Sequence, residues 1–396
     1  MRKVFQRMLL CLTLGTAFCT ANAVDIPRPE YPRPQFERTD WVNLNGQWTF
    51  EMDFGSSGEQ RGWTNSKGLS KKITVPFCPE SELSGIGYTD FIPCVWYQRN
   101  INIPAEWNGK KILLHFGAAD YETKVYVDGK MVGEHKGAGS SFNFDITSYV
   151  KAGQQANLVV RVYDNLRGGM QPGGKQCTEL FSAGCSYTRV TGIWQTVWME
   201  AVNEQALKNV FAIPDIDQQQ LVVRPEFYNE GNNNTLTVEV KDGKKTVAKR
   251  TSQASNQSTI VLPIKNAHLW SPEDVKYTVK NAQGEVIDEV SSYMGMRKVH
   301  ISGGYFYLNN KPYFQRLVLD QGYYPDGIWT APSDEALRQD IEMSKAVGFN
   351  GARLHQKVFE ERYYYWADKL GYLTWGEEAS WVLNINNELA VRNFLT

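Results

Sequence analysis

The secondary-structure signals of this chain change once, near residue 303, and this change limits the possible folds most. Up to about residue 300, short segments alternate apolar and polar residues around turn signals. The segments "TKVYVDGKMVGEH", with Asp128-Gly129, and "LTVEVKDGKKTVAKR", with Asp242-Gly243, each predict a β-hairpin. Because helical periodicity is absent from this region, we predict two β-sandwiches that meet near residue 202.

After residue 303 the signals of strands and helices alternate. "YFQRLVLD", "GARLH" and "YLTWGEE" have the composition of strands, and the segments between them have the periodicity of helices. Ser333 is suited to cap the first helix, which we expect to end at Gly348, and Gly371 is suited to end the second helix. Strands that alternate with helices form parallel sheets, so we predict at most three βα units, the third of them incomplete.

The N-terminus has the features of an export signal. Arg2, Lys3 and Arg7 precede the apolar run "MLLCLTLGTAFCTA", and an A-x-A cleavage site ends at Ala23. The alternative, a lipoprotein anchored at Cys19, is disfavoured by the bulky residue that precedes this cysteine. We therefore expect residues 1–23 to be removed and the protein to be periplasmic or secreted.

Composition excludes several other classes of protein. The formal net charge is −1 and no basic stripe occurs, which argues against nucleic-acid binding. The apolar run of the signal is too short to span a membrane. Four cysteines remain after the signal, in spacings that fit no zinc site, and we expect buried free thiols. If a disulfide exists, Cys177–Cys185 is the favoured pair. The aromatic content of 13% fits β-rich cores as well as sugar-stacking surfaces.

Several segments, in their order along the chain, resemble glycoside hydrolase family 2. "NLNGQWTF", "VPFCPES" and "SYTRVTGIWQTVWMEAV" are similar to its N-terminal jelly-roll sugar-binding domain, and "LWSPEDVKYTVK" is similar to the immunoglobulin-like β-sandwich that follows. "FNGARLHQKVFEERYYYWADKLGYLTWGEEASW" resembles the opening of the (β/α)8 TIM barrel of the family. The resemblance implies a multidomain, mainly β protein with domains at 24–201, 202–300 and 301–396, the last an incomplete barrel.

The resemblance also implies a retaining exo-β-glycosidase of carbohydrate catabolism, which hydrolyses O-glycosyl bonds with two glutamates. In the family both glutamates follow late barrel strands, and no stretch of this sequence matches their surroundings. Glu377 and Glu378 are neighbours in a strand, so their side chains point to opposite faces. Glu388 follows Asn387, a residue suited to cap a helix, and is expected in the first turn of that helix.

We therefore expect no catalytic residue in this chain, which we interpret as an inactive fragment. Two alternatives stay open. The chain could be a non-catalytic carbohydrate-binding module or scaffold, or it could complement a separate barrel half. The sugar, the linkage and the oligomeric state are also left open by the sequence.

Substrate-binding residues are expected where the parallel strands end, because active sites of such barrels form at the carboxyl ends of the strands. Asp320 and Gln321 follow the first strand, His355 follows the second, and Glu377 and Trp381 follow the third. For Glu377 a structural ion pair is the alternative role. Arg353, inside the second strand, is expected to orient carboxylates.

One long glycine-rich loop of the first domain, "GGMQPGGKQCTELFSAGCSYTRV", is also a candidate for contact with the sugar. Ser186 stands where some β-galactosidases of the family have an aspartate that contacts galactose, which argues against that contact. Lys175 and Tyr187 are the alternatives. Some members bind magnesium shortly after the third strand, but "ASWVLN" contains neither of the ligands, so we expect no metal and no cofactor.

Overall fold

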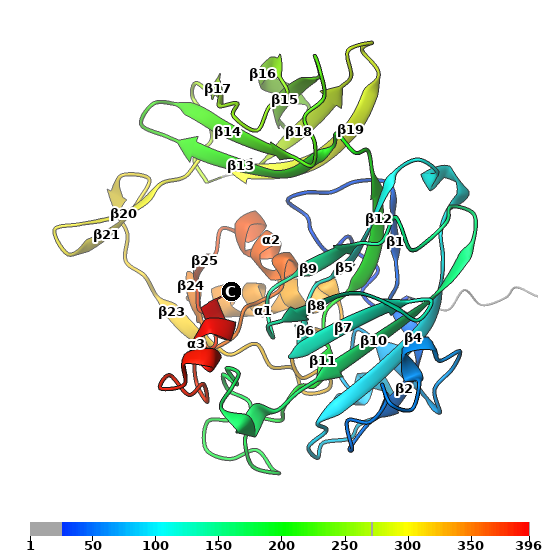
Figure 1. Ribbon diagram of the computed structural model, residues 1–396. Coiled ribbons are helices and arrows are strands. Elements are labelled where there is room, and N and C mark those ends of the chain that lie inside the picture. Colours follow the sequence, from blue (N-terminus) through cyan, green and yellow to red (C-terminus); the bar gives the residue numbers. More distant parts are fainter. Residues whose placement is uncertain (1–25, 271, 396) are drawn as a thin grey trace, which may run out of the picture.

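The computed structural model describes residues 26–270 and 272–395, and the expected export signal lies outside them. Figure 1 shows two β-sandwiches and a smaller part in which helices and strands alternate. The two sandwiches lie side by side, and the α/β part contacts both of them.

The first sandwich is built from two antiparallel sheets of residues 41–202. Its core contains Trp48, Tyr97, Leu114, Val160 and Met199, which come from both sheets. The larger sheet has the order β3 (Lys71–Val75), β2 (Gly46–Met52), β4 (Cys94–Asn102), β10 (Gln155–Tyr163), β7 (Glu122–Val127) and β8 (Lys130–Lys136). The smaller has the order β1 (Trp41–Asn43), β12 (Val197–Val202), β5 (Lys111–Phe116) and β9 (Phe142–Asp145), and β6 (Ala119–Asp120) pairs with β11 (Gly192–Ile193).

The predicted hairpin at Asp128-Gly129 is confirmed, because these two residues join β7 and β8 with φ angles of 47° and 77°. Positive φ at both central residues is the mark of a type I′ turn. The first sandwich also has four single-turn 3-10 helices, at Trp63–Asn65, Glu82–Ser84, Ala105–Trp107 and Leu166–Gly168.

The second sandwich contains the strands between residues 207 and 295. One sheet has the order β13 (Leu207–Asp215), β14 (Gln220–Phe227) and β17 (Ile260–Pro263). The other has the order β16 (Lys245–Gln253), β15 (Thr235–Asp242), β18 (Pro272–Lys280) and β19 (Val286–Gly295). The hairpin expected here exists, but its turn is Gly243-Lys244, one residue later than predicted. Gly243, with φ of 57°, takes the first central position, where a type II′ turn favours glycine.

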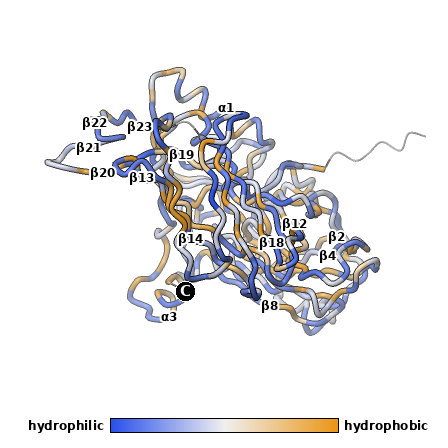
Figure 2. Tube along the Cα trace, turned by 90° about the horizontal axis from the view of Figure 1, so that it is seen from above, coloured by the Kyte–Doolittle hydropathy of each residue, from blue (hydrophilic) through white to orange (hydrophobic). Residues whose placement is uncertain are grey.

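The third part begins with a hairpin and continues with a parallel sheet. The hairpin consists of β20 (Val299–Ser302), β21 (Tyr305–Leu308) and β22 (Lys311–Pro312), and it extends away from the rest of the molecule (Figures 1 and 2). The following elements are β23 (Leu317–Asp320), α1 (Asp334–Ala346), β24 (Gly351–Leu354), α2 (Glu361–Leu370), β25 (Leu373–Gly376) and α3 (Glu388–Leu395). The predicted parallel pairing is confirmed, since β24 pairs with both β23 and β25.

The predicted helix ends are also confirmed. The Ser333 hydroxyl oxygen accepts a hydrogen bond from the Ala336 amide at 3.1 Å, and Gly371 ends α2 with φ of 64°. Asn387 caps α3, because its side-chain oxygen accepts hydrogen bonds from the amides of Leu389 and Ala390.

Two buried arginines join the parts. Arg38 donates hydrogen bonds to Asp288 of the second sandwich at 2.9 Å and to Glu200 of the first at 3.2 Å. Arg28 pairs with Glu360, directly before α2, at 2.6 Å. Among the helices of the described residues, none combines the length and apolar character that a membrane span requires.

Candidate functional site

A long loop of the first sandwich, residues 164–191, lies on the segments that follow β24 and β25. The Gly173 amide donates to the Trp381 carbonyl at 2.8 Å, and the Asn384 amide donates to the Gly169 carbonyl at 2.8 Å. Figure 1 shows this loop, in green, beside α3, in red. At Gly174 the backbone approaches the Gln356 carbonyl so closely that an added Cβ would lie 2.3 Å from its oxygen. The loop therefore needs a glycine at this contact.

Buried polar side chains hold the loop to its own sandwich and stabilise it internally. Gln176 donates to Asp120 of β6 at 2.7 Å and accepts from the Val190 amide of the same loop at 2.7 Å. Gln171 donates to Asp164, also within the loop, at 2.7 Å. Burial raises the pKa of Asp164 to about 7 and raises that of Asp120 well above its ordinary range.

Three of the predicted site residues come together at the carboxyl ends of β24 and β25. Nδ1 of His355 lies 2.9 Å from a carboxylate oxygen of Glu377, and the His355 ring meets the Trp381 ring edge-on with centroids 5.9 Å apart. Trp381 is 44% exposed, so part of its ring is open to a ligand. This cluster, His355, Glu377 and Trp381, is called the strand-end cluster below.

Glu377 is held as a charged hydrogen-bond acceptor. Burial acts to raise its pKa, but hydrogen bonds from Arg353, His355 and the Gln356 amide outweigh it and hold the pKa below its ordinary value. The arginine and the imidazole also fix the orientation of the carboxylate. An ionised, fixed carboxylate with lone pairs to spare is suited to accept hydrogen bonds from sugar hydroxyls.

Asp320 and Gln321 lie at the end of β23 but have no hydrogen bond with the strand-end cluster through their side chains. The Asp320 carboxylate accepts from the Gly322 amide at 2.8 Å and from the Tyr363 hydroxyl of α2 at 3.2 Å. Its backbone carbonyl accepts from the His355 amide at 2.7 Å. Gln321 is half-buried. The contact of both residues with substrate stays a prediction.

Lys175 brings the loop into contact with the strand-end cluster. Its ammonium nitrogen lies 3.7 Å from the centroid of the Trp381 ring and 3.3 Å from the Cys185 sulfur. Tyr187, the other candidate residue of the loop, packs against Tyr323 with ring centroids 4.6 Å apart.

Sequence reasoning missed the role of Gln356 in shaping this cluster. Its side-chain oxygen accepts hydrogen bonds from the amides of Ser380 and Trp381 at 2.9 and 3.0 Å, which fixes the backbone after β25. The position of Gln356 after a strand was the available signal, but nothing local indicates that it bonds to residues 24 and 25 positions later.

The side chains of the other two glutamates of this region form no hydrogen bond with the strand-end cluster. Glu378 is exposed and accepts a hydrogen bond from the Ala379 amide at 3.1 Å. Glu388 lies on α3 with 88% of its side chain exposed, and it pairs with Arg392 one helical turn later.

No cluster of three or more His, Cys, Asp or Glu side chains suited to a metal occurs among residues 26–270 and 272–395. All four cysteines of these residues are free thiols, and three of them are buried as expected. Cys185 is different, because the docked loop leaves it exposed.

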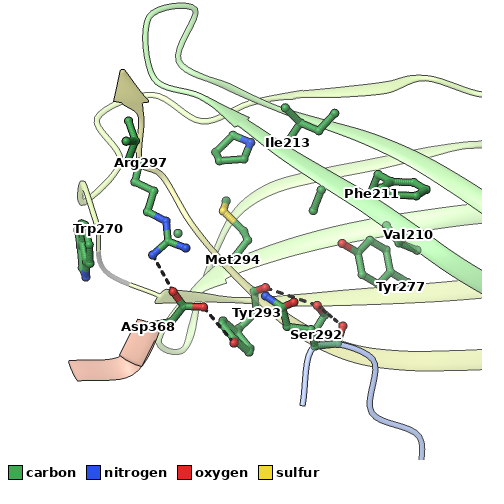
Figure 3. Close-up of a pocket in the computed structure, with 15 residues that line it drawn as sticks. Val210, Phe211, Ile213, Trp270, Tyr277, Ser292, Tyr293, Met294, Arg297 and Asp368 are labelled. Atoms are coloured by element: carbon green, nitrogen blue, oxygen red, sulfur yellow. Dashed lines mark hydrogen bonds and ion pairs between the residues drawn. The ribbon is translucent and has the colours of Figure 1, made fainter. Parts of the chain in front are cut away.

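A separate cavity of about 480 Å³ lies between the second sandwich and α2 (Figure 3). At its edge Arg297 and Tyr293 both donate to Asp368, at 2.6 and 3.1 Å. None of the predicted site residues lines this cavity, so it does not belong to the candidate site.

Two family models match adjacent parts of the chain. The sugar binding domain of the glycosyl hydrolases family 2 matches residues 41–199, and a second model of glycosyl hydrolases family 2 matches residues 205–297. A β-galactosidase of Thermoanaerobacter pseudethanolicus is 28% identical over 301 residues, which cover 72% of this chain and 39% of that protein. A β-glucuronidase of Bacteroides fragilis is 25% identical over 367 residues, which cover 85% of this chain and 49% of that protein. The chain thus spans less than half the length of these relatives.

The solved structure of a β-glucuronidase from Ruminococcus gnavus in complex with D-glucuronic acid has a similar fold. The TM-score is 0.77 at 23% sequence identity, over 93% of this chain and 64% of that one. At this identity the likeness concerns the fold alone. With both family models matching in succession along its two sandwiches, the chain belongs to glycosyl hydrolases family 2.

Proposed function

We propose that this chain forms the sugar-binding front of an exported, retaining β-glycosidase that cleaves O-glycosyl bonds of β-glycosides. The observation that carries the proposal is the docking of the loop at 164–191 onto the ends of β24 and β25. It puts a sugar-binding domain against the end of a parallel sheet at which barrel enzymes bind their substrates. The relatives named β-galactosidase and β-glucuronidase support the same reaction class.

In this proposal residues 24–201, 202–300 and 301–396 are a jelly roll, an immunoglobulin-like sandwich and the first βα units of a (β/α)8 barrel. The exposed part of the Trp381 ring stacks on the apolar face of a sugar. Glu377 accepts hydrogen bonds from sugar hydroxyls, and His355 orients Glu377. Asp320 and Gln321 add contacts from the end of β23.

We also propose that Glu377, Glu378 and Glu388 do not supply the pair of catalytic glutamates. A retaining pair flanks one bond with its carboxyl groups about 5–5.5 Å apart. Glu377 is bound by Arg353 and His355, and Glu388 is exposed on a helix surface. We therefore propose that the 396-residue chain alone binds β-glycosides but does not hydrolyse them.

The test is an assay of the chain that begins at Val24, with aryl β-glucuronides, β-galactosides, β-glucosides and β-mannosides. We expect saturable binding, seen as a change of tryptophan fluorescence that Trp381→Ala weakens, and no hydrolysis above background. Turnover that Glu377→Gln, Glu378→Gln or Glu388→Gln abolishes would make these carboxylates catalytic and contradict the proposal.

A non-catalytic binding module is the second candidate function, favoured by the same lack of a suitable glutamate pair. The two candidate functions can be distinguished by mixing the chain with a polypeptide that carries the remaining βα units of a family-2 barrel. Restored turnover identifies a glycosidase part that complements a separate barrel half, whereas continued inactivity with intact sugar binding favours the module. N-terminal sequencing of exported protein tests the export proposal, for which Val24 is the expected first residue.

A further inference from the structure

Lys175 is a buried cation without an anionic partner in the part of the chain that the structure describes. Only 4% of the residue is exposed, and its ammonium group contacts the Cys185 sulfur at 3.3 Å and the Trp381 ring at 3.7 Å. A thiol is a weak acceptor, and an ammonium group has three hydrogens to donate. Burying a charge is costly unless it is paired, so this position is poised for an anion.

The other buried lysine, Lys357, shows how a purely structural lysine is satisfied in the same fold. It is 5% exposed, and its ammonium group donates to the carbonyl oxygens of Gly322 and Trp329 at 2.6 and 2.9 Å. Lys175 has no such carbonyl partners among the described residues. This difference indicates that the role of Lys175 is not purely structural.

Hydrogen bonds fix the backbone from which the Lys175 side chain extends. The Tyr187 amide donates to the Lys175 carbonyl at 2.8 Å, and the neighbouring Gln176 is anchored on Asp120. Two residues away, Gly173 is bonded to Trp381. The backbone of Lys175 is therefore anchored beside the strand-end cluster, and its side chain is buried against Trp381.

The Cys185 and Trp381 side chains, which contact the ammonium group, are both exposed, so a ligand that displaces the thiol would reach the charge from the surface. The nearest ionised carboxylate of the cluster, Glu377, is already bound by Arg353 and His355. An anion that approaches over Trp381 thus meets an unpaired cation.

We propose that Lys175 recognises an oxyanion carried by the sugar, either the carboxylate of a uronic acid or a sulfate ester. This inference rests on the proposed function and adds a residue of the sugar-binding domain that selects charged over neutral glycosides. The oxyanion takes the place of the Cys185 thiol as the acceptor and forms a charge-assisted hydrogen bond, which is stronger than the contact that it replaces.

The test is calorimetric titration of the chain with three probes: methyl β-D-glucuronide, methyl β-D-glucoside 6-sulfate and unmodified methyl β-D-glucoside. We expect at least one charged probe to bind at least tenfold more tightly than the neutral one, the usual strength of a hydrogen bond to a charged group. Tighter binding of the glucuronide identifies the carboxylate as the natural anion, and tighter binding of the sulfate identifies the ester.

Two variants of Lys175 test whether its positive charge is needed, because one removes the charge and the other keeps it. Lys175→Met should lower the affinity for the charged probe to that for the neutral one, and Lys175→Arg should keep the preference because the charge remains. Lys208→Met, which removes an exposed lysine of the second sandwich, is the control and should change neither affinity.

Equal binding of charged and neutral probes by the unmodified chain would overturn this inference and leave the proposed function intact. If Lys175→Met keeps the preference for charged probes, another residue binds the anion, and the inference about Lys175 is also overturned. If none of the three probes nor any other β-glycoside binds, the proposed function itself fails.

Discussion

Arg38 is the residue on which the contact between the two sandwiches depends most directly. Its guanidinium group lies between Glu200 and Asp288, and all three side chains are almost fully buried. It also donates to the Leu207 carbonyl at 2.6 Å, where the chain enters the second sandwich. Removing the arginine would leave two buried carboxylates without their cation.

We predict that Arg38→Met lowers the free energy of unfolding by about 3–5 kcal/mol, the usual cost of breaking a buried ion pair from one side. Lys208→Met is the matched control, because it breaks the exposed Lys208–Glu226 pair of the second sandwich and should cost about 0–1 kcal/mol. Urea unfolding followed by circular dichroism measures both. Equal losses for the two variants would contradict the role given to Arg38.

Buried carboxyl groups behind the long loop give the protein an unusual dependence on pH. Burial raises the pKa of Glu80 and of Asp164 to about 7 each. In the unfolded chain such groups have pKa values of about 4. Between these values the folded protein holds protons that the unfolded chain releases, so their contribution to stability falls as pH rises.

We predict that the free energy of unfolding decreases between about pH 4 and pH 7, by up to about 1.4 kcal/mol per pH unit for each group. Asp164→Asn and Glu80→Gln mimic the protonated forms and should each flatten this slope. The pKa of Glu377 is lowered in the folded protein, so its contribution to stability increases with pH, but only at lower pH. Unfolding curves from pH 4.5 to 8 provide the measurement. Glu335→Gln, an exposed change on α1, should leave the slope as it is, and an unchanged slope in Asp164→Asn would refute the explanation.

Sequence reasoning selected candidate site residues where a general rule of the fold applies. His355, Glu377 and Trp381 could be chosen because they follow strands that had to be parallel. The Arg38 contact could not be predicted, because its partner Asp288 is 250 residues away and no local pattern links them. The burial of Glu80 and Asp164 could not be predicted either, because nothing in the sequence around a single acidic residue shows that it is buried.

At the scale of elements, local signals were enough wherever backbone chemistry decides the outcome. Ser333 and Gly371 mark helix ends because capping and left-handed backbone conformations depend on the residue itself. The β20–β22 hairpin was missed, although Gly303-Gly304 forms its turn with φ angles of 57° and 80°. Its strands are only two to four residues long, too short for alternation to stand out.

The docking of the long loop onto the ends of β24 and β25 can be tested at one glycine. We predict that Gly174→Ala prevents docking, because the added methyl group would lie 2.3 Å from the Gln356 carbonyl oxygen. Gly184→Ala, in the same loop, is the matched control: it has a similar φ of 59° but open space around the added group. Limited proteolysis should cut the loop faster in Gly174→Ala than in Gly184→Ala. Equal rates would show that backbone strain, and not the contact, governs the loop.

At the scale of the whole molecule, apolar side chains are exposed on the hairpin and on the segment that leads to β23. Ile301, Tyr305 and Phe314 are 70%, 68% and 79% exposed. The hairpin stands away from the rest of the molecule in both views of Figures 1 and 2. Exposed apolar strands with unpaired edges favour association.

We predict that the chain that begins at Val24 self-associates through this hairpin and the segment that follows it, and that the double variant Ile301→Lys, Phe314→Glu reduces the association. The two charges make contact between apolar strands unfavourable without touching either sandwich core. Phe181→Glu is the matched control, because Phe181 is equally exposed, at 78%, but lies on the long loop of the first sandwich. Light scattering over a range of protein concentrations measures the effect. If Phe181→Glu lowers the apparent mass as much as the double variant, association is a general result of exposed apolar surface. If neither variant lowers it, the chain associates through a different surface.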